Sequence, residues 1–185
     1  MNTILLNSDD IARVIERMAF EILEQHADCP DLMLLGIQRR GVDIARRLDK
    51  ILNERLGTRL PFGTLDINLY RDDWTSLQGS PTIGASSIPT PLDGKNIILV
   101  DDVLFTGRTI RAALEAVLDY GRPRRVELLV LIDRGLRELP IHADYIGRKV
   151  ETVPTDYVDV FLEERDGRDE VALVRQDVGE AGSEV

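Results

Sequence analysis

Cysteine, aromatic residues and positive charge are all scarce in this sequence. One Cys among 185 residues excludes a disulfide framework and a cysteine-based zinc cluster, and it favours a reducing compartment. The 33 acidic and 23 basic residues give a formal net charge of -10. That charge argues against a dedicated nucleic-acid-binding protein, whose surface replaces phosphate counterions with Lys and Arg. Aromatic residues are 5% of the chain, so stacking platforms for single-stranded nucleic acid are also few.

Long apolar runs are absent as well. No stretch approaches the roughly 18 to 20 apolar residues that cross a bilayer, and residues 1–4 lack the basic start and apolar core of a signal peptide. We therefore expect a cytoplasmic protein without a membrane partner. A length of 185 residues and a hydrophobic content of 43% predict one domain. We place it at residues 1–178 and expect a disordered acidic tail at 179–185.

The spacing of apolar residues alternates between helix and strand along the chain. Helical spacing, with Ser8 as the expected first cap, occurs at 8–23, 42–56 and 110–118. Unbroken apolar runs, which are typical of strands buried on both faces, occur at 32–37, 97–100 and 126–132. Polar and apolar residues alternate at 64–69, which predicts a strand with one polar side. This order predicts an α/β fold with a doubly wound, mostly parallel sheet and a ligand site at the carboxyl ends of its strands.

Two further segments do not fit this alternation. Residues 144–174 hold shorter strand-like pieces, such as 157–162, and predict a small appended antiparallel subdomain. Residues 71–92 are rich in Gly, Ser and Pro and have almost no periodicity. A loop of about twenty residues inside a compact domain is usually functional, so we weigh a lid over the site against a surface insertion without a role.

The densest chemical signal lies at 97–109, where a buried strand is followed by two acids, a turn and the start of a helix. Backbone N–H groups of the turn and helix start, with the hydroxyls of Thr106 and Thr109, suit a phosphate dianion. Asp101 and Asp102 suit the two hydroxyls of a ribose, because a carboxylate accepts charge-assisted hydrogen bonds. The alternative is that both acids merely end the strand and cap the helix.

This segment resembles the 5-phosphoribosyl-1-pyrophosphate (PRPP) signature of type I phosphoribosyltransferases, and 36–41 resembles the pyrophosphate loop of that family. The resemblance implies the type I phosphoribosyltransferase fold, catalytic acids that hold the ribose, and Mg²⁺ carried by PRPP without a direct protein site. For the loop, a plain connection with solvated Arg residues is the alternative. The residues implied in PRPP binding are Arg39, Arg40, Asp101, Asp102, Val103, Leu104, Phe105, Thr106, Gly107, Arg108 and Thr109.

Residues 130–147, together with 69–73 and 121–123, resemble the PyrR family of pyrimidine-operon attenuators that are also uracil phosphoribosyltransferases. The resemblance implies that uracil and PRPP give UMP and pyrophosphate, and that subunits form a homo-oligomer. It places the base-binding subdomain mainly at 133–174, with uracil contacts from Arg134 and from the backbone near Val158. Arg71 is the expected catalytic phosphate contact from the long loop.

The chain departs from the PyrR pattern at positions that the family associates with RNA. Leu136 and His142 replace a usual His and Arg, and a weaker basic surface lowers affinity for phosphates. UMP- or UTP-dependent binding of pyrimidine-leader RNA therefore stays open, as do an attenuator with little catalysis and an enzyme for another base. Arginines that either contact RNA or are isolated surface residues are Arg17, Arg137 and Arg148. We expect His26 and His142 to be surface or packing residues.

Overall fold

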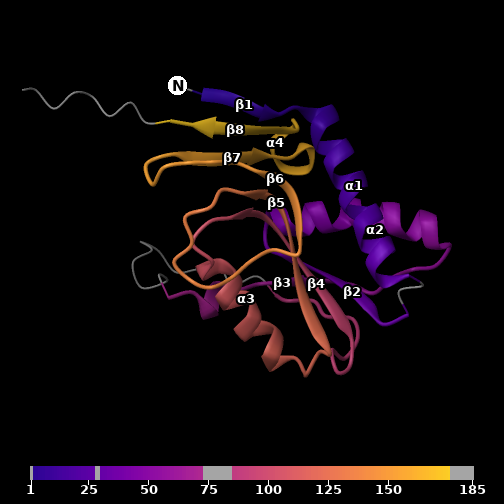
Figure 1. Ribbon diagram of the computed structural model, residues 1–185. Helices are drawn as coiled ribbons and strands as arrows, with labels where there is room; N and C mark the ends of the chain where they lie inside the picture. Colours follow the sequence, from indigo (N-terminus) through magenta and orange to yellow (C-terminus); the bar gives the residue numbers. More distant parts are fainter. Residues whose placement is uncertain (1, 28–29, 73–84, 176–185) are drawn as a thin grey trace, which may run out of the picture.

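A five-stranded parallel sheet forms the centre of the molecule (Figure 1). The computed structural model describes residues 2–27, 30–72 and 85–175, so the expected tail at 179–185 lies outside it. The strands follow the order β3-β2-β4-β5-β6. Their bounds are β2 (Leu32–Ile37), β3 (Phe62–Leu65), β4 (Asn96–Leu104), β5 (Arg125–Asp133) and β6 (Tyr145–Lys149).

Three longer helices cover the two faces of this sheet (Figure 1). Apolar side chains of α1 and α2 pack in one core cluster with Ile98 and Leu129, and those of α3 pack in a second with Ile97 and Val130. Successive residues of β4 and β5 thus face opposite layers, which confirms the doubly wound α/β fold. The helices are α1 (Ser8–His26), α2 (Arg40–Leu56), α3 (Arg108–Asp119), the short α4 (Glu163–Asp166) and the 3-10 turn η1 (Asn68–Tyr70).

Two local details differ from the sequence prediction. Asn7, and not Ser8, caps α1: its side chain accepts from Asp10 N at 2.9 Å, and the Asp10 carboxylate accepts from Asn7 N at 3.1 Å. The strand expected at 64–69 ends at Leu65. Past that point the Asp66 carboxylate accepts from Asn68 N at 2.9 Å, a local bond that competes with strand pairing and begins the turn η1.

A small antiparallel sheet lies beyond β6, in the order β1-β8-β7 (Figure 1). Its strands are β1 (Asn2–Leu6), β7 (Tyr157–Phe161) and β8 (Glu170–Val174). An appended antiparallel part was predicted, but its membership differs: β6 pairs parallel with β5 in the main sheet, and the unpredicted β1 completes the small one. Within the described ranges, none of the helices has the length and apolar character of a membrane span.

Candidate active site

Two adjacent carboxylates lie near the carboxyl end of β4. The strand continues to Leu104, so Asp101 and Asp102 are part of it and do not follow it. Asp101 is 6% exposed, and its Oδ1 accepts from Asp102 N at 3.0 Å. Burial raises the pKa of Asp101 well above its usual value, the negative charge of Asp102 raises it further, and Arg71 opposes the shift. Asp101 therefore holds its proton more readily than an exposed carboxyl.

A cavity of about 250 Å³ lies between the turn after β4 and Arg71, lined by residues 103–110. Gly107 closes the turn with φ +93, a backbone conformation that L side chains rarely adopt. Behind the turn, the Thr106 carbonyl accepts from Glu138 N and Leu139 N at 3.0 and 3.1 Å. The first N–H groups of α3 have no acceptor within their own helix, so they can bind an anion in the cavity.

The segment before the long loop is docked on α3, which places Arg71 at this cavity. Arg111 donates to the Tyr70 carbonyl at 2.8 Å, and the Tyr70 hydroxyl donates to Asp119 at 2.6 Å. That bond raises the pKa of Tyr70 to about 12. The Arg108 side chain binds Asp72 and is half-exposed. The part of Arg108 that we expect to contact an anion in the cavity is therefore its backbone N–H group. Residues 73–84 of the expected lid lie outside the described part of the chain.

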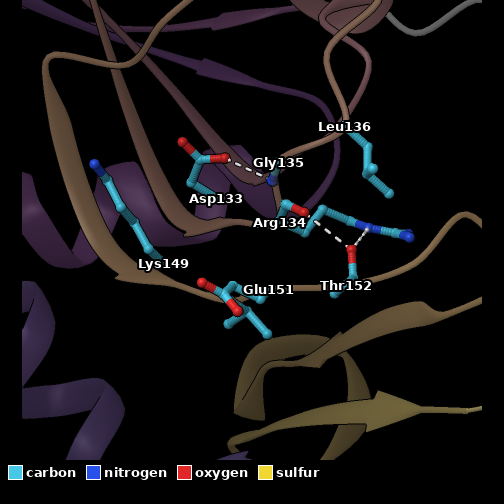
Figure 2. Close-up of a pocket in the computed structure, with 8 residues that line it drawn as sticks. Asp133, Arg134, Gly135, Leu136, Lys149, Glu151 and Thr152 are labelled. Carbon is cyan, nitrogen blue, oxygen red and sulfur yellow. Dashed lines mark hydrogen bonds between the residues drawn. The ribbon is translucent and has the colours of Figure 1, made fainter.

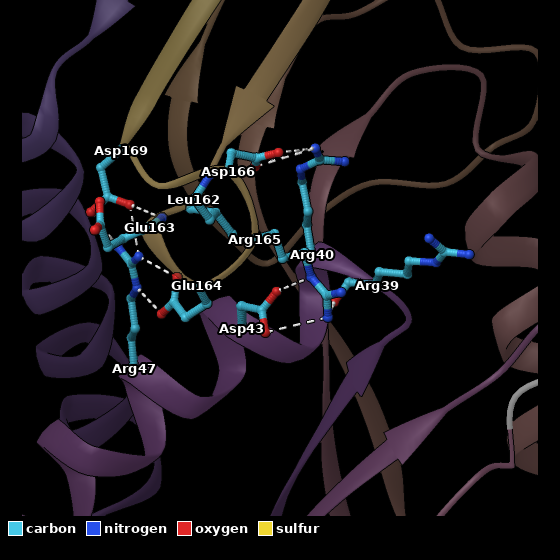
Figure 3. A network of polar contacts seen from close by, with 10 residues as sticks. All are labelled: Arg39, Arg40, Asp43, Arg47, Leu162, Glu163, Glu164, Arg165, Asp166 and Asp169. Carbon is cyan, nitrogen blue, oxygen red and sulfur yellow. Dashed lines mark hydrogen bonds and ion pairs between the residues drawn. The ribbon is translucent and has the colours of Figure 1, made fainter.

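The loop between β2 and α2 lies close against β4. A Cβ on Gly41 would be 2.3 Å from the Val100 carbonyl oxygen and 3.1 Å from the Asp101 Cα, so the first turn of α2 can approach only because residue 41 has no side chain. The two arginines of this loop differ. Arg40 donates to Asp166 at 3.1 Å, whereas Arg39 is exposed and extends away from the ion pairs around it (Figure 3).

A second cavity, of about 460 Å³, lies at the carboxyl end of β5 (Figure 2). Among the described residues, those that line it belong to 133–136 and 149–152. The predicted base contact Arg134 is buried there, and its guanidinium lies over the Phe105 ring at 4.0 Å. It donates to the Asp156 carbonyl at 2.6 Å and exchanges hydrogen bonds with Thr152. Arg134 therefore links the turn after β4 to a wall of this cavity.

The other predicted base contact, Val158, lies in β7 and outside the lining of both cavities. It pairs with Leu173 of β8 and packs against the α1 and α2 side of the core. The structure thus brings together the turn residues, Asp101, Asp102 and Arg71, and it connects Arg134 to them through Phe105. Within the described ranges, no group of three or more His, Cys, Asp or Glu side chains is arranged to hold a metal ion.

Arg137 is a structural member of the site that the sequence did not reveal. Its guanidinium donates to the Phe105 carbonyl at 2.8 Å and the Gly135 carbonyl at 3.0 Å, and it pairs with Asp133 at 2.6 Å. Its side chain is only 16% exposed. Arg137 thus ties the loop after β5 to the turn after β4, a contact between segments about thirty residues apart that no local pattern signals.

The remaining candidate RNA contacts also bind main-chain carbonyls. Arg17 donates to Gly147 O at 2.6 Å, and Arg148 donates to Leu5 O at 2.5 Å. His26 is nearly buried and forms a 2.6 Å contact with Glu127, which confirms it as a packing residue, and His142 is exposed. Arg17, which also pairs with Glu21, and Arg148 are exposed at the surface, while Arg137 is committed to the site.

Comparisons with known proteins identify the family of the chain. Residues 1–165 match the family model of the phosphoribosyl transferase domain. A protein of Syntrophobacter fumaroxidans named "Bifunctional protein PyrR" is 48% identical over 170 residues, covering 92% of this chain and 91% of that protein. One of the same name from Desulfosudis oleivorans is 49% identical over 172 residues, covering 92% and 95%.

Solved structures share the fold at low sequence identity. A hypoxanthine phosphoribosyltransferase of Staphylococcus aureus aligns with a TM-score of 0.67 at 20% identity, covering 95% of this chain and 93% of that one. The enzyme of Trypanosoma cruzi aligns with a TM-score of 0.69 at 17% identity, covering 94% and 91%. The predicted type I phosphoribosyltransferase fold is confirmed. Because residues 1–165 match this domain and the relatives named PyrR are 48% and 49% identical in sequence, the chain belongs to the phosphoribosyl transferase domain family and, within it, to the PyrR family.

Proposed function

We propose that the protein transfers the phosphoribosyl group of PRPP to uracil, giving UMP and pyrophosphate. The observation that carries the proposal is the meeting of three features at one end of the parallel sheet. These are an anion-binding turn, two carboxylates beside it, and a second cavity joined to the turn by Arg134 over Phe105. The relatives named bifunctional PyrR support the choice of a pyrimidine base.

In this proposal PRPP lies along the carboxyl end of β4. Its 5-phosphate occupies the cavity of residues 103–110, bound by N–H groups of the helix start and by Arg71. The ribose hydroxyls bind Asp101 and Asp102. The pyrophosphate group extends toward the loop before α2, where the exposed Arg39 can reach it and Arg40 adds charge.

Transfer breaks the bond between C1 of the ribose and the pyrophosphate oxygen and forms a bond from C1 to uracil N1, and the departing pyrophosphate takes up the proton that N1 loses. The transition state has oxocarbenium character, so the site must stabilise the departing anion and exclude water. Arg39 and Arg71 supply positive charge on either side of the ribose acids. The raised pKa of Asp101 favours the protonated carboxyl, which can donate a hydrogen bond to a ribose hydroxyl or accept one from it.

Mg²⁺ fits this site as an ion that arrives with PRPP. Carboxylate and phosphate oxygens are its preferred ligands, and the partly exposed Asp102 carboxylate beside the turn offers such an oxygen. When bound, the ion would neutralise charge on the leaving pyrophosphate. Because Asp101 is buried and its pKa is raised, it suits a ribose hydroxyl better than a cation.

Uracil is proposed to bind in the cavity at the end of β5, against Arg134; the other predicted base contact, Val158, lies outside the lining of this cavity. The described hydrogen bonds of the Arg134 guanidinium use Nε and Nη2, so Nη1 remains for a base carbonyl. Main-chain groups are fixed and directional and suit a planar pyrimidine, so those of the lining residues at 133–136 and 149–152 are the proposed partners of the base. Thr152 holds the Arg134 carbonyl at 2.9 Å and so sets the wall's position.

A test with several bases decides the proposal. Purified protein with Mg²⁺ and PRPP should convert uracil to UMP and leave hypoxanthine, guanine and orotate largely unchanged. Preferred turnover of a purine or of orotate would refute it. Asp102→Asn serves as the control, since it should lower UMP formation at least about tenfold without unfolding the protein.

A second proposed role is UMP- or UTP-dependent binding of a pyrimidine-leader RNA, favoured by the relatives' description as bifunctional. Titration of a leader hairpin should then show salt-sensitive binding that needs the nucleotide. Absence of binding at low salt would reject this role. We also propose a homo-oligomer and, from the single cysteine, a cytoplasmic location.

A further inference from the structure

A set of ion pairs joins α2, which follows the pyrophosphate loop, to α4, which connects β7 and β8 of the small sheet (Figure 3). All the positive partners are arginines, and the segments they join are more than 110 residues apart. The pairs are Arg40 with Asp166, Arg47 with Glu164 and Asp169, and Arg165 with Asp43.

Arg165 differs from the other arginines because it also binds the main chain of the loop. Its Nη2 donates to the Arg39 carbonyl at 3.3 Å, and the same guanidinium pairs with the Asp43 carboxylate. Asp43 lies in the first turn of α2, and its side chain is 3% exposed. A carboxylate buried this deeply needs its cationic partner, so Arg165 is held firmly in place.

The position of the Arg39 peptide decides where its side chain can reach. The chain approaches β4 so closely at Gly41 that the loop has little room to shift toward the ribose acids. The carbonyl of residue 39 accepts from Val42 N within the helix start at 3.2 Å, and Arg165 Nη2 is its second donor, at 3.3 Å. The loop is therefore held both by its close packing on β4 and by a side chain that comes from the small-sheet region.

We propose that Arg165 is a positioning residue for pyrophosphate, acting through the main chain of Arg39. This inference rests on the proposed function, since it takes the loop before α2 to bind the pyrophosphate group of PRPP. Arg165 does not touch the substrate. Instead it connects α4, which lies between two strands of the small sheet, to the loop that holds the leaving group.

Arg47 provides a matched control for this role. It joins α2 to Glu164 of α4 at 2.6 Å and to Asp169, between α4 and β8, at 2.7 Å, and it belongs to neither the loop nor the proposed substrate contacts. A residue that merely fastens α4 to α2 would behave like Arg47. A positioning residue would instead change the constants for pyrophosphate and PRPP selectively.

The test compares Arg165→Gln and Arg47→Gln in the full-length protein. Calorimetric titration with Mg²⁺ and inorganic pyrophosphate should show an affinity about tenfold lower for Arg165→Gln and within about twofold of wild type for Arg47→Gln. In steady-state kinetics the KM for PRPP should rise for Arg165→Gln, with the KM for uracil nearly unchanged. Equal effects of the two variants, or an unchanged pyrophosphate affinity in Arg165→Gln, would overturn the proposal.

Removing Arg165 leaves the buried Asp43 unpaired and threatens folding. The double variant Asp43→Asn with Arg165→Gln removes that charge and should fold, yet it should still bind pyrophosphate about tenfold more weakly, because the contact to residue 39 is lost. Wild-type affinity in the double variant would contradict the positioning role.

The binding measurement needs no turnover, so the two proposals fail separately. If wild type binds pyrophosphate and Arg165→Gln does not, while no UMP forms from uracil, the uracil transferase activity is wrong and the positioning role stands. If UMP forms at the wild-type KM for PRPP in Arg165→Gln, the positioning role is wrong and the activity stands. If the wild-type protein does not bind pyrophosphate, the positioning role of Arg165 is also wrong, whether or not UMP forms.

Discussion

The substitution Gly41→Ala tests how closely the pyrophosphate loop and the ribose acids are coupled. Gly41 lies in the first turn of α2, where its backbone is an ordinary helical one, so an alanine meets no conformational obstacle there. The obstacle is space. The added Cβ would lie 2.3 Å from the Val100 carbonyl oxygen and 3.1 Å from the Asp101 Cα, both of them backbone atoms of the central strand that cannot rotate away.

The size of the effect follows from these distances. Ordinary contact begins near 3.4 Å, so α2 and β4 must separate by about 1 Å at this point. Overpacking of this kind costs about 1 to 3 kcal/mol, against which alanine gains about 1 kcal/mol of helix propensity. A displacement of about 1 Å in a reacting group can lower the rate about 100-fold. We therefore expect a small loss of stability and a large loss of catalysis.

The assay is steady-state formation of UMP, paired with thermal unfolding. Gly57→Ala is the matched control, since Gly57 ends the same helix at φ +64 with open space around it. It should lose about 1 to 2 kcal/mol of stability through backbone strain and keep wild-type kinetics. If Gly41→Ala keeps kcat and the KM for PRPP within about twofold of wild type, the close packing beside Asp101 has no catalytic role and the reasoning fails.

Three further predictions concern single side chains. Asp101→Asn should lower UMP formation at least about tenfold yet raise the melting temperature at neutral pH, because burial makes the ionised carboxylate destabilising. In calorimetry this gain in melting temperature should vanish as the pH falls toward 3.8, and a gain that did not depend on pH would contradict the prediction. Arg137→Gln should lower the free energy of unfolding in urea by about 2 kcal/mol and raise the KM for PRPP; an unchanged KM would count against its link to the turn. Thr152→Val should raise the KM for uracil up to about tenfold and spare the KM for PRPP, whereas a parallel rise in both would separate it from the base site.

The centre of the fold could be predicted because its strands are buried on both faces. Such strands appear in the sequence as unbroken apolar runs, and the runs at 32–37, 97–100 and 126–132 became β2, β4 and β5. The phosphate turn could be predicted for a related reason: strand, acids, turn and helix start follow one another without interruption at 97–109. Contiguous signals of this kind need no knowledge of distant contacts.

The small antiparallel sheet was predicted, but which strands belong to it, and the ion pairs beside it, could not be predicted in the same way. β6 is a short strand with exposed residues at its end, and apolar spacing does not state whether a strand pairs parallel or antiparallel. The helix α4 has only four residues, too few for a helical period. Arg165 and Asp43 are 122 residues apart, and a contact over that separation leaves no local trace in one sequence.

The pairing of β1 with β8 fixes the order in which this molecule can mature on the ribosome. Asn2 pairs with Val174, so β1 cannot complete its pairing until β8 has been synthesised. The parallel strands that carry the phosphate turn are complete at residue 149, well before that moment. A nascent chain halted between residues 149 and 165 would hold the phosphate turn while lacking the guanidinium of Arg165, so the proposed hold on the Arg39 carbonyl could form only after residue 165 is made.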